Sequence, residues 1–115
     1  MRLATVLALL PGIAIGGAAD LLTAQCAAFW LGRDDYAARS AYLDRTPGDL
    51  LLARDFRDAA VRLNNGAAAP VDAFIAAERH NMALLTEAMI LGDRQSRDLH
   101  DRLAARCAGP AKPQP

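Results

Sequence analysis

Two cysteines, Cys26 and Cys107, constrain the fold of this 115-residue chain more than any other feature. They lie near the two ends of the part of the chain that can form a domain, so a bond between them would join those ends. A disulfide requires the two Cα atoms to lie within about 7 Å of each other. It would close a loop of about 82 residues and, in the chain-entropy model, contribute roughly 4–5 kcal/mol. That is comparable to the whole stability expected of a small domain.

The N-terminus indicates the compartment in which such a bond would form. Arg2 precedes an uncharged apolar run, residues 3–19, which ends in small residues before Asp20. This arrangement is typical of a secretory signal peptide. The run is shorter than the roughly 20 apolar residues of a membrane-spanning helix, and proline and glycine interrupt it. We therefore expect cleavage after Ala18 or Ala19, with retention as an anchor as the alternative, and export to the bacterial periplasm or the medium.

Cys26 could also be a lipid attachment point or a catalytic thiol. A bacterial lipoprotein signal places a small residue directly before the cysteine, whereas Gln25 stands there and an acidic residue separates it from the apolar run. A nucleophilic cysteine needs a histidine to activate it, and no local signature links His80 or His100 to this position. An even cysteine count in a small exported protein favours a disulfide. The sequence therefore predicts a Cys26–Cys107 bond.

The chain after the apolar run is predicted to be all-helical. Ala, Leu and Arg dominate, and no window alternates apolar and polar residues over the length of a strand. Thr46 can cap a helix, with Pro47 in its first position and Asp49 where a capping box has an acid. Gly66 and Gly92 are expected to end the helices before them. These signals predict four helices, at residues 20–45, 47–64, 70–91 and 93–106.

The predicted disulfide provides a check on the number of helices. Cys26 would lie near the start of the first helix and Cys107 at the end of the last. In an up-down bundle these two points share one end only when the number of helices is even. A continuous helix over residues 70–106 would be about 55 Å long and would place Cys107 at the wrong end. The disulfide and a break at Gly92, with Asp93 capping the next helix, therefore support each other.

We accordingly predict a small up-down four-helix bundle that follows a signal peptide and is closed by one long-range disulfide. The signal peptide would occupy residues 1–19, the bundle residues 20–107, and a disordered tail residues 108–115. The first helix has an alternative form. It could break at Gly32, with Asp34 capping a separate second part.

Two charged residues interrupt the apolar stripes of their helices and are the candidate polar site. Arg33 lies on the stripe of the first helix, and Glu78 on that of the third. A lone buried charge costs several kcal/mol, so buried charges tend to be paired. We favour positions at the edge of the helix seam, where long side chains reach water. The alternatives are a buried Arg33–Glu78 ion pair that fixes the register, or a polar pocket inside the bundle.

Trp30, Tyr36 and Tyr42 concentrate the scarce aromatic residues in the first helix. We expect Trp30 to fill a second helix interface; otherwise these aromatics could anchor a protein partner. His80 lies off the seam and is expected to be exposed, and His100 stands among charged residues. Neither histidine has another ligand at a metal-binding spacing, so we predict no metal and no cofactor.

Composition narrows the classes of function. Acidic and basic residues are balanced, 13 of each, which does not favour nucleic acid or an anionic membrane as a partner. No stable membrane insertion is expected after cleavage.

We predict a non-catalytic, exported interaction module of the chaperone, inhibitor or adaptor type, whose partner is another protein. The alternative is a small-ligand or metal-binding bundle that uses the Arg33/Glu78 region. An apolar cavity containing both side chains would favour the alternative, and a solid core with an exposed aromatic patch would favour the interaction module.

Overall fold

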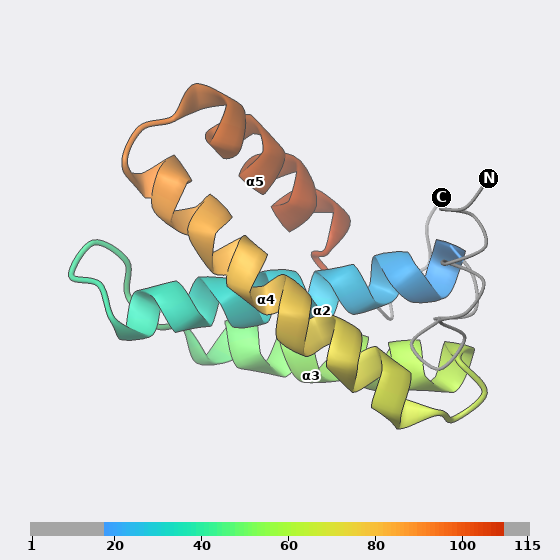
Figure 1. Ribbon diagram of the computed structural model, residues 1–115. Helices are drawn as coiled ribbons and strands as arrows, with labels where there is room; N and C mark the ends of the chain where they lie inside the picture. The colour runs from blue at the N-terminus through green and yellow to red at the C-terminus, as the bar shows by residue number, and fades with distance from the viewer. Residues whose placement is uncertain (1–17, 110–115) are drawn as a thin grey trace, which may run out of the picture.

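The computed structural model describes residues 18–109, which form an all-α, up-down bundle without strands in that part of the chain (Figure 1). The expected signal peptide lies outside the described residues except for its last two positions, and residues 110–115 of the expected tail also lie outside them. The predicted all-α bundle of four helices is confirmed for residues 18–109. The helices are α2 (Ala18–Ala38), α3 (Pro47–Leu63), α4 (Ala68–Ile90) and α5 (Arg94–Arg106).

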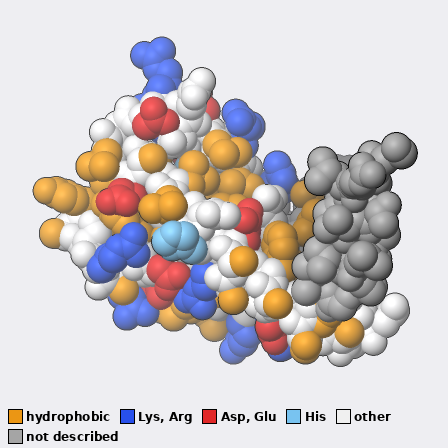
Figure 2. Space-filling view, in the orientation of Figure 1, with side chains coloured by type: hydrophobic (Ala, Val, Ile, Leu, Met, Phe, Trp, Pro, Cys, Tyr) orange, Lys and Arg blue, Asp and Glu red, His pale blue; other side chains and the backbone are white. Residues whose placement is uncertain are grey.

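Helix α2 is the central element of the bundle. It lies beside α3, α4 crosses over it, and α5 runs back along α4 toward the first half of α2 (Figure 1). The disulfide joins that half of α2 to the end of α5, with 5.3 Å between the Cα atoms of Cys26 and Cys107. The predicted bond and the even number of described helices thus occur together. Figure 2 shows acidic and basic side chains interspersed over one face, as a balanced composition would suggest.

The core lies where α2 meets α3 and α4. Phe29 and Val71 are fully buried at its centre, and Phe56 and Ile75 pack beside them. Small side chains let the helices approach closely, and burying the large ones stabilises the fold by about 1.5–3 kcal/mol each. The buried alanines of this core are Ala24, Ala27, Ala28, Ala53 and Ala60.

Helix α2 ends at Ala38, seven residues before the predicted end at residue 45. The chain then turns back, and Arg45 donates from Nε and Nη2 to the two carboxylate oxygens of Asp34, at 3.0 and 2.9 Å. Bidentate pairs of this kind are strong and directional. Pro47 also disfavours helical backbone in the residue before it. Residues 39–46 therefore form a loop tied to the side of α2.

Helix α2 does not break at Gly32, because this glycine is its contact point with α4. A Cβ atom built at position 32 would lie 2.5 Å from Met82 Cβ, 2.7 Å from Ala83 N and 2.7 Å from Arg79 O. No other residue type leaves room for the two backbones to approach so closely. The sequence suggested a break here, but the glycine serves helix packing.

The turn between α4 and α5 follows the predicted signals. Gly92 has φ +99°, and the N–H group of Asp93 donates to Ala88 O at 3.0 Å, which closes α4. The side chain of Asp93 accepts from Ser96 N at 2.9 Å and caps α5. The Ser96 hydroxyl also donates to this carboxylate, at 2.6 Å, and the hydrogen bonds from the Ser96 hydroxyl and N–H group lower the pKa of Asp93. The predicted break at Gly92 and the cap at Asp93 are confirmed.

Helix α3 ends one residue before its predicted end at residue 64, and α4 starts two residues before its predicted start at residue 70. Two residues with positive φ, Asn65 at 58° and Gly66 at 80°, follow α3, and Gly66 N donates to Val61 O at 2.8 Å. Helix α4 begins at Ala68, two residues before Pro70. Proline is tolerated there because N–H groups in the first turn have no acceptor inside the helix.

Candidate functional site

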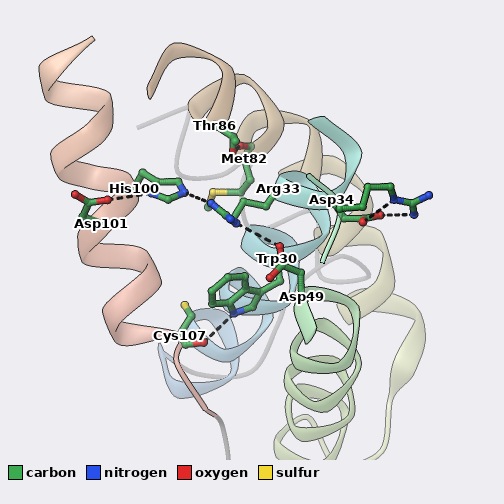
Figure 3. Close-up of polar contacts among 10 residues, drawn as sticks. Trp30, Arg33, Asp34, Asp49, Met82, Thr86, His100, Asp101 and Cys107 are labelled. Carbon is green, nitrogen blue, oxygen red and sulfur yellow. Dashed lines mark hydrogen bonds and ion pairs between the residues drawn. The ribbon is translucent and has the colours of Figure 1, made fainter. Parts of the chain in front are cut away.

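Arg33 lies at the meeting point of α2, α3 and α5 (Figure 3). Its Nε atom donates to Asp49 Oδ2 at 3.3 Å, and its Nη1 atom donates to His100 Nε2 at 2.9 Å. The suggested Arg33–Glu78 pair is therefore not formed. Gly32 faces α4, and the next residue projects about 100° further round the helix. Arg33 consequently projects from a different side of α2 than the Gly32 contact, and it bonds to Asp49 and His100 and not to Glu78.

His100 is a buried member of this cluster, which the sequence did not indicate. Its residue is only 6 % exposed, and its ring lies 5.2 Å from that of Phe29. A guanidinium group can only donate, so Nε2 of His100 must accept from Arg33. The proton then sits on Nδ1, which lies 3.2 Å from Asp101 Oδ1. The geometry assigns a neutral His100 with the proton on Nδ1.

Asp49 has a different role from the one predicted. The side chain of Thr46 makes no capping hydrogen bond, and the carboxylate of Asp49 binds Arg33 instead of completing a capping box. Asp49 is 8 % exposed, so its negative charge is largely withdrawn from water. A buried carboxylate of this kind requires a cationic partner, and Arg33 supplies it.

Asp35, two residues after Arg33 on α2, connects this helix to α4. Arg79 donates from Nε and Nη2 to the two oxygens of Asp35, both at 2.8 Å. Hydrogen bonding to Asp35 raises the pKa of Arg79 above its ordinary value. No buried side-chain nitrogen or oxygen in residues 18–109 lacks a hydrogen-bond partner. The charged cluster around Arg33 is thus internally satisfied and holds the helices together.

The three candidate aromatic anchors do not form a surface patch. Trp30 is 9 % exposed, and its Nε1 atom donates to the carbonyl oxygen of Cys107 at 2.8 Å. Tyr36 is 5 % exposed, whereas Tyr42 lies in the loop after α2 and is 76 % exposed. Trp30 and Tyr36 are therefore part of the packed interior, and only Tyr42 offers its ring to a partner.

A groove between α4 and α5 is the main candidate binding site. Its volume is about 370 Å³, and Figure 2 shows hydrophobic side chains on the face between these two helices. Met82 and Leu103 are buried and form its floor, and Leu99 is 40 % exposed at its wall. The lining residues are Gln25, Glu78, Asn81, Met82, Leu85, Leu99, Leu103 and Arg106.

The two ends of the groove differ in chemistry. Figure 1 shows that α4 and α5 run in opposite directions. Glu78 therefore lines the groove toward the end where α5 finishes, with Arg106, and Leu85 lines it toward the end where α5 begins, with Leu99. Gln25 of α2 lines the same groove near the disulfide, at the charged end. The groove therefore has a polar end with one acid, one base and two amides, Gln25 and Asn81, and an aliphatic end.

The charged side chains of the groove are not paired with each other. Glu78 is half-buried, and within the described residues its carboxylate accepts a hydrogen bond only from Asn81 Nδ2, at 3.0 Å, on its own helix. Within residues 18–109, the guanidinium of Arg106 has no hydrogen bond and no ion pair. Sequence reasoning singled out Glu78 but missed Arg106, because only the antiparallel packing of α4 and α5 brings them to one groove.

Comparison with known proteins does not identify this chain, since no family model, curated protein or solved structure matches it. No helix in the described part of the chain is long and apolar enough to span a membrane. Residues 18–109 also contain no group of three His, Cys, Asp or Glu side chains placed to hold a metal ion.

Proposed function

We propose that this protein is an exported, non-catalytic binding protein that holds a small amphipathic ligand in the groove between α4 and α5. The observation that carries the proposal is an aliphatic floor with an unpaired acid and an unpaired base at one end. Ligand sites are typically apolar clefts of about 300–1,000 Å³ with a few placed polar groups. This is the second of the two functions considered from the sequence, with Arg106 in the place suggested for Arg33.

Export to the periplasm or the medium is part of this proposal. Disulfides persist in oxidising compartments and are rare in the cytosol. The Cys26–Cys107 bond therefore supports a location outside the cytoplasm, as does the pattern of residues 1–19 in the sequence.

A second candidate is the protein-interaction module expected from the sequence. Leu84 of α4 is 48 % exposed, and Leu91, which directly follows α4, is 73 % exposed. Exposed leucines can contact a partner protein. This surface differs from the groove, so the two candidate functions can be tested separately.

A ligand screen by NMR on the oxidised, isotope-labelled protein tests the proposed function. Binding in the groove should shift the signals of Met82, Leu85, Leu99 and Leu103. Leu99→Lys, which places a charge in the groove wall, should abolish these shifts. Leu84→Lys, a substitution at a similarly exposed leucine outside the groove, should leave them unchanged.

Absence of any groove binding in the screen would refute the small-ligand proposal. Binding that survives Leu99→Lys but is lost in Leu84→Lys would assign the function to the outer face of α4 instead.

A further inference from the structure

The polar end of the groove carries two opposite charges, and this restricts the ligands it can accept. We infer that the groove binds a free α-amino acid with a large apolar side chain, an inference that rests on the proposed function above. The ligand ammonium would contact Glu78, its carboxylate would contact Arg106, and its side chain would lie over Met82 and Leu103.

Charge complementarity favours a zwitterion over ligands with a single charge. A fatty acid would pair with Arg106 but would bring its carboxylate toward the carboxylate of Glu78. An apolar amine would pair with Glu78 but would face the guanidinium of Arg106. Like charges placed within a few ångströms repel, and opposite charges attract. Only a ligand with both charges on its head group matches both side chains.

The amide groups at this end suit the same head group. Asn81 Nδ2 donates to Glu78 Oε1 at 3.0 Å, which orients the carboxylate. Gln25 contributes an amide from α2, with both a donor and an acceptor. A guanidinium can bind a carboxylate through two parallel hydrogen bonds, so Arg106 is well suited to the ligand's carboxylate.

The size and lining of the groove determine which side chain the amino-acid ligand can have. Its volume of about 370 Å³ is at the small end of ligand sites, which fits one amino acid better than a peptide. Leu85 and Leu99 at the far end present only aliphatic surface. An aliphatic or aromatic side chain would be buried there, whereas a charged one would lose its hydration without a partner.

Titrations with matched ligands test this inference. L-leucine and L-phenylalanine are added to the oxidised full chain up to millimolar concentrations, and groove signals are followed by NMR. Isopentylamine, which lacks the carboxylate, and isocaproate, which lacks the ammonium, are the comparison ligands. Each should bind at least about tenfold more weakly than L-leucine, because one ionic hydrogen bond is lost.

Charge-removing variants assign the two contacts. Glu78→Gln should weaken L-leucine binding about tenfold or more while leaving isocaproate binding unchanged or tighter. Arg106→Gln should weaken L-leucine similarly and leave isopentylamine unchanged or tighter. The matched controls are Glu87→Gln on α4 and Arg102→Gln on α5, which do not line the groove and should bind L-leucine as the wild type does.

The outcomes separate this inference from the proposed function. If other apolar compounds shift the groove signals but amino acids do not, the ligand class is wrong and the groove remains a binding site. If no compound binds, both fail. Wild-type affinity for L-leucine in both charge variants would overturn the inference even if leucine binds.

Discussion

Arg33 illustrates at the residue scale how the environment of a charged side chain depends on several helices. Its position on an apolar stripe of α2 indicated either a seam-edge residue or a buried pair with Glu78. The guanidinium instead contacts Asp49 of α3 and His100 of α5, and its side chain is 18 % exposed. It joins three helices through two partners that lie 16 and 67 residues away in sequence.

We predict that Arg33→Ala lowers the free energy of unfolding by about 2–4 kcal/mol, because the Asp49 carboxylate and His100 Nε2 lose their shared partner. Urea unfolding of the oxidised protein, followed by circular dichroism, measures the change. Glu78→Ala is the matched control, since this carboxylate is half-buried and its hydrogen bond comes from Asn81 on its own helix. Its effect should stay within about 0.5 kcal/mol. Equal losses in the two variants would contradict the assignment of Arg33 as the buried ionic centre.

At the scale of elements, the crossing of α2 over α4 depends on the absence of a side chain at Gly32. Glycine in a helix interior is usually destabilising relative to alanine, by about 1 kcal/mol. That cost is accepted here because the backbone of α4 occupies the space of a Cβ atom. The crossing point then sets which faces of α2 remain for α3 and α5.

Gly32→Ala is therefore expected to destabilise the protein by about 1–3 kcal/mol, in spite of the better helix propensity of alanine. Gly48→Ala is the control, because a Cβ atom there would lie 3.8 Å from its closest neighbour, Thr46 Cγ2. That variant should be neutral or more stable by up to about 1 kcal/mol. Thermal unfolding of both variants checks the prediction, and a stabilised Gly32→Ala would show that α2 and α4 can separate without cost.

At the scale of the whole molecule, α5 depends on a covalent bond. It packs along α4 and touches α2 at few points, while α2, α3 and α4 share the main core. Besides packing, α5 is held by the Arg33–His100 hydrogen bond, the Trp30–Cys107 hydrogen bond and the disulfide. The groove exists only while α5 is docked, because Leu99, Leu103 and Arg106 belong to it.

Replacing both cysteines with serine should reduce stability by about 2–5 kcal/mol. We expect the loss of order to begin in α5, with faster amide hydrogen exchange over residues 94–106 and slower exchange retained in α2 and α3. Trp30 fluorescence should shift toward longer wavelength as its contact with Cys107 opens. Uniform acceleration of exchange across all four described helices would contradict this order. Retained groove binding in the serine variant would show that α5 docks without the bond.

The parts of this protein that could be predicted from sequence are those set by local or covalent chemistry. Gly92 adopts a positive φ that favours glycine, Asp93 accepts the free N–H group of its own helix, and two cysteines permit one pairing. These constraints allowed the turn before α5 and the closure of the bundle by a disulfide to be predicted from the sequence. The end of α2 was placed too late, because the loop after Ala38 is held by Arg45 binding back to Asp34.

Tertiary structure alone decided which side chains meet. The rotation of α2 about its own axis, set at Gly32, turns Arg33 toward Asp49 and His100, to which it bonds in place of Glu78. The antiparallel pairing of α4 and α5 brings Arg106 into the groove that Glu78 lines. A helical stripe in the sequence shows that a face is apolar, but it does not show which neighbour covers that face. The partners of Arg33 and the charged end of the groove therefore follow from helix packing, which depends on contacts between residues distant in the chain.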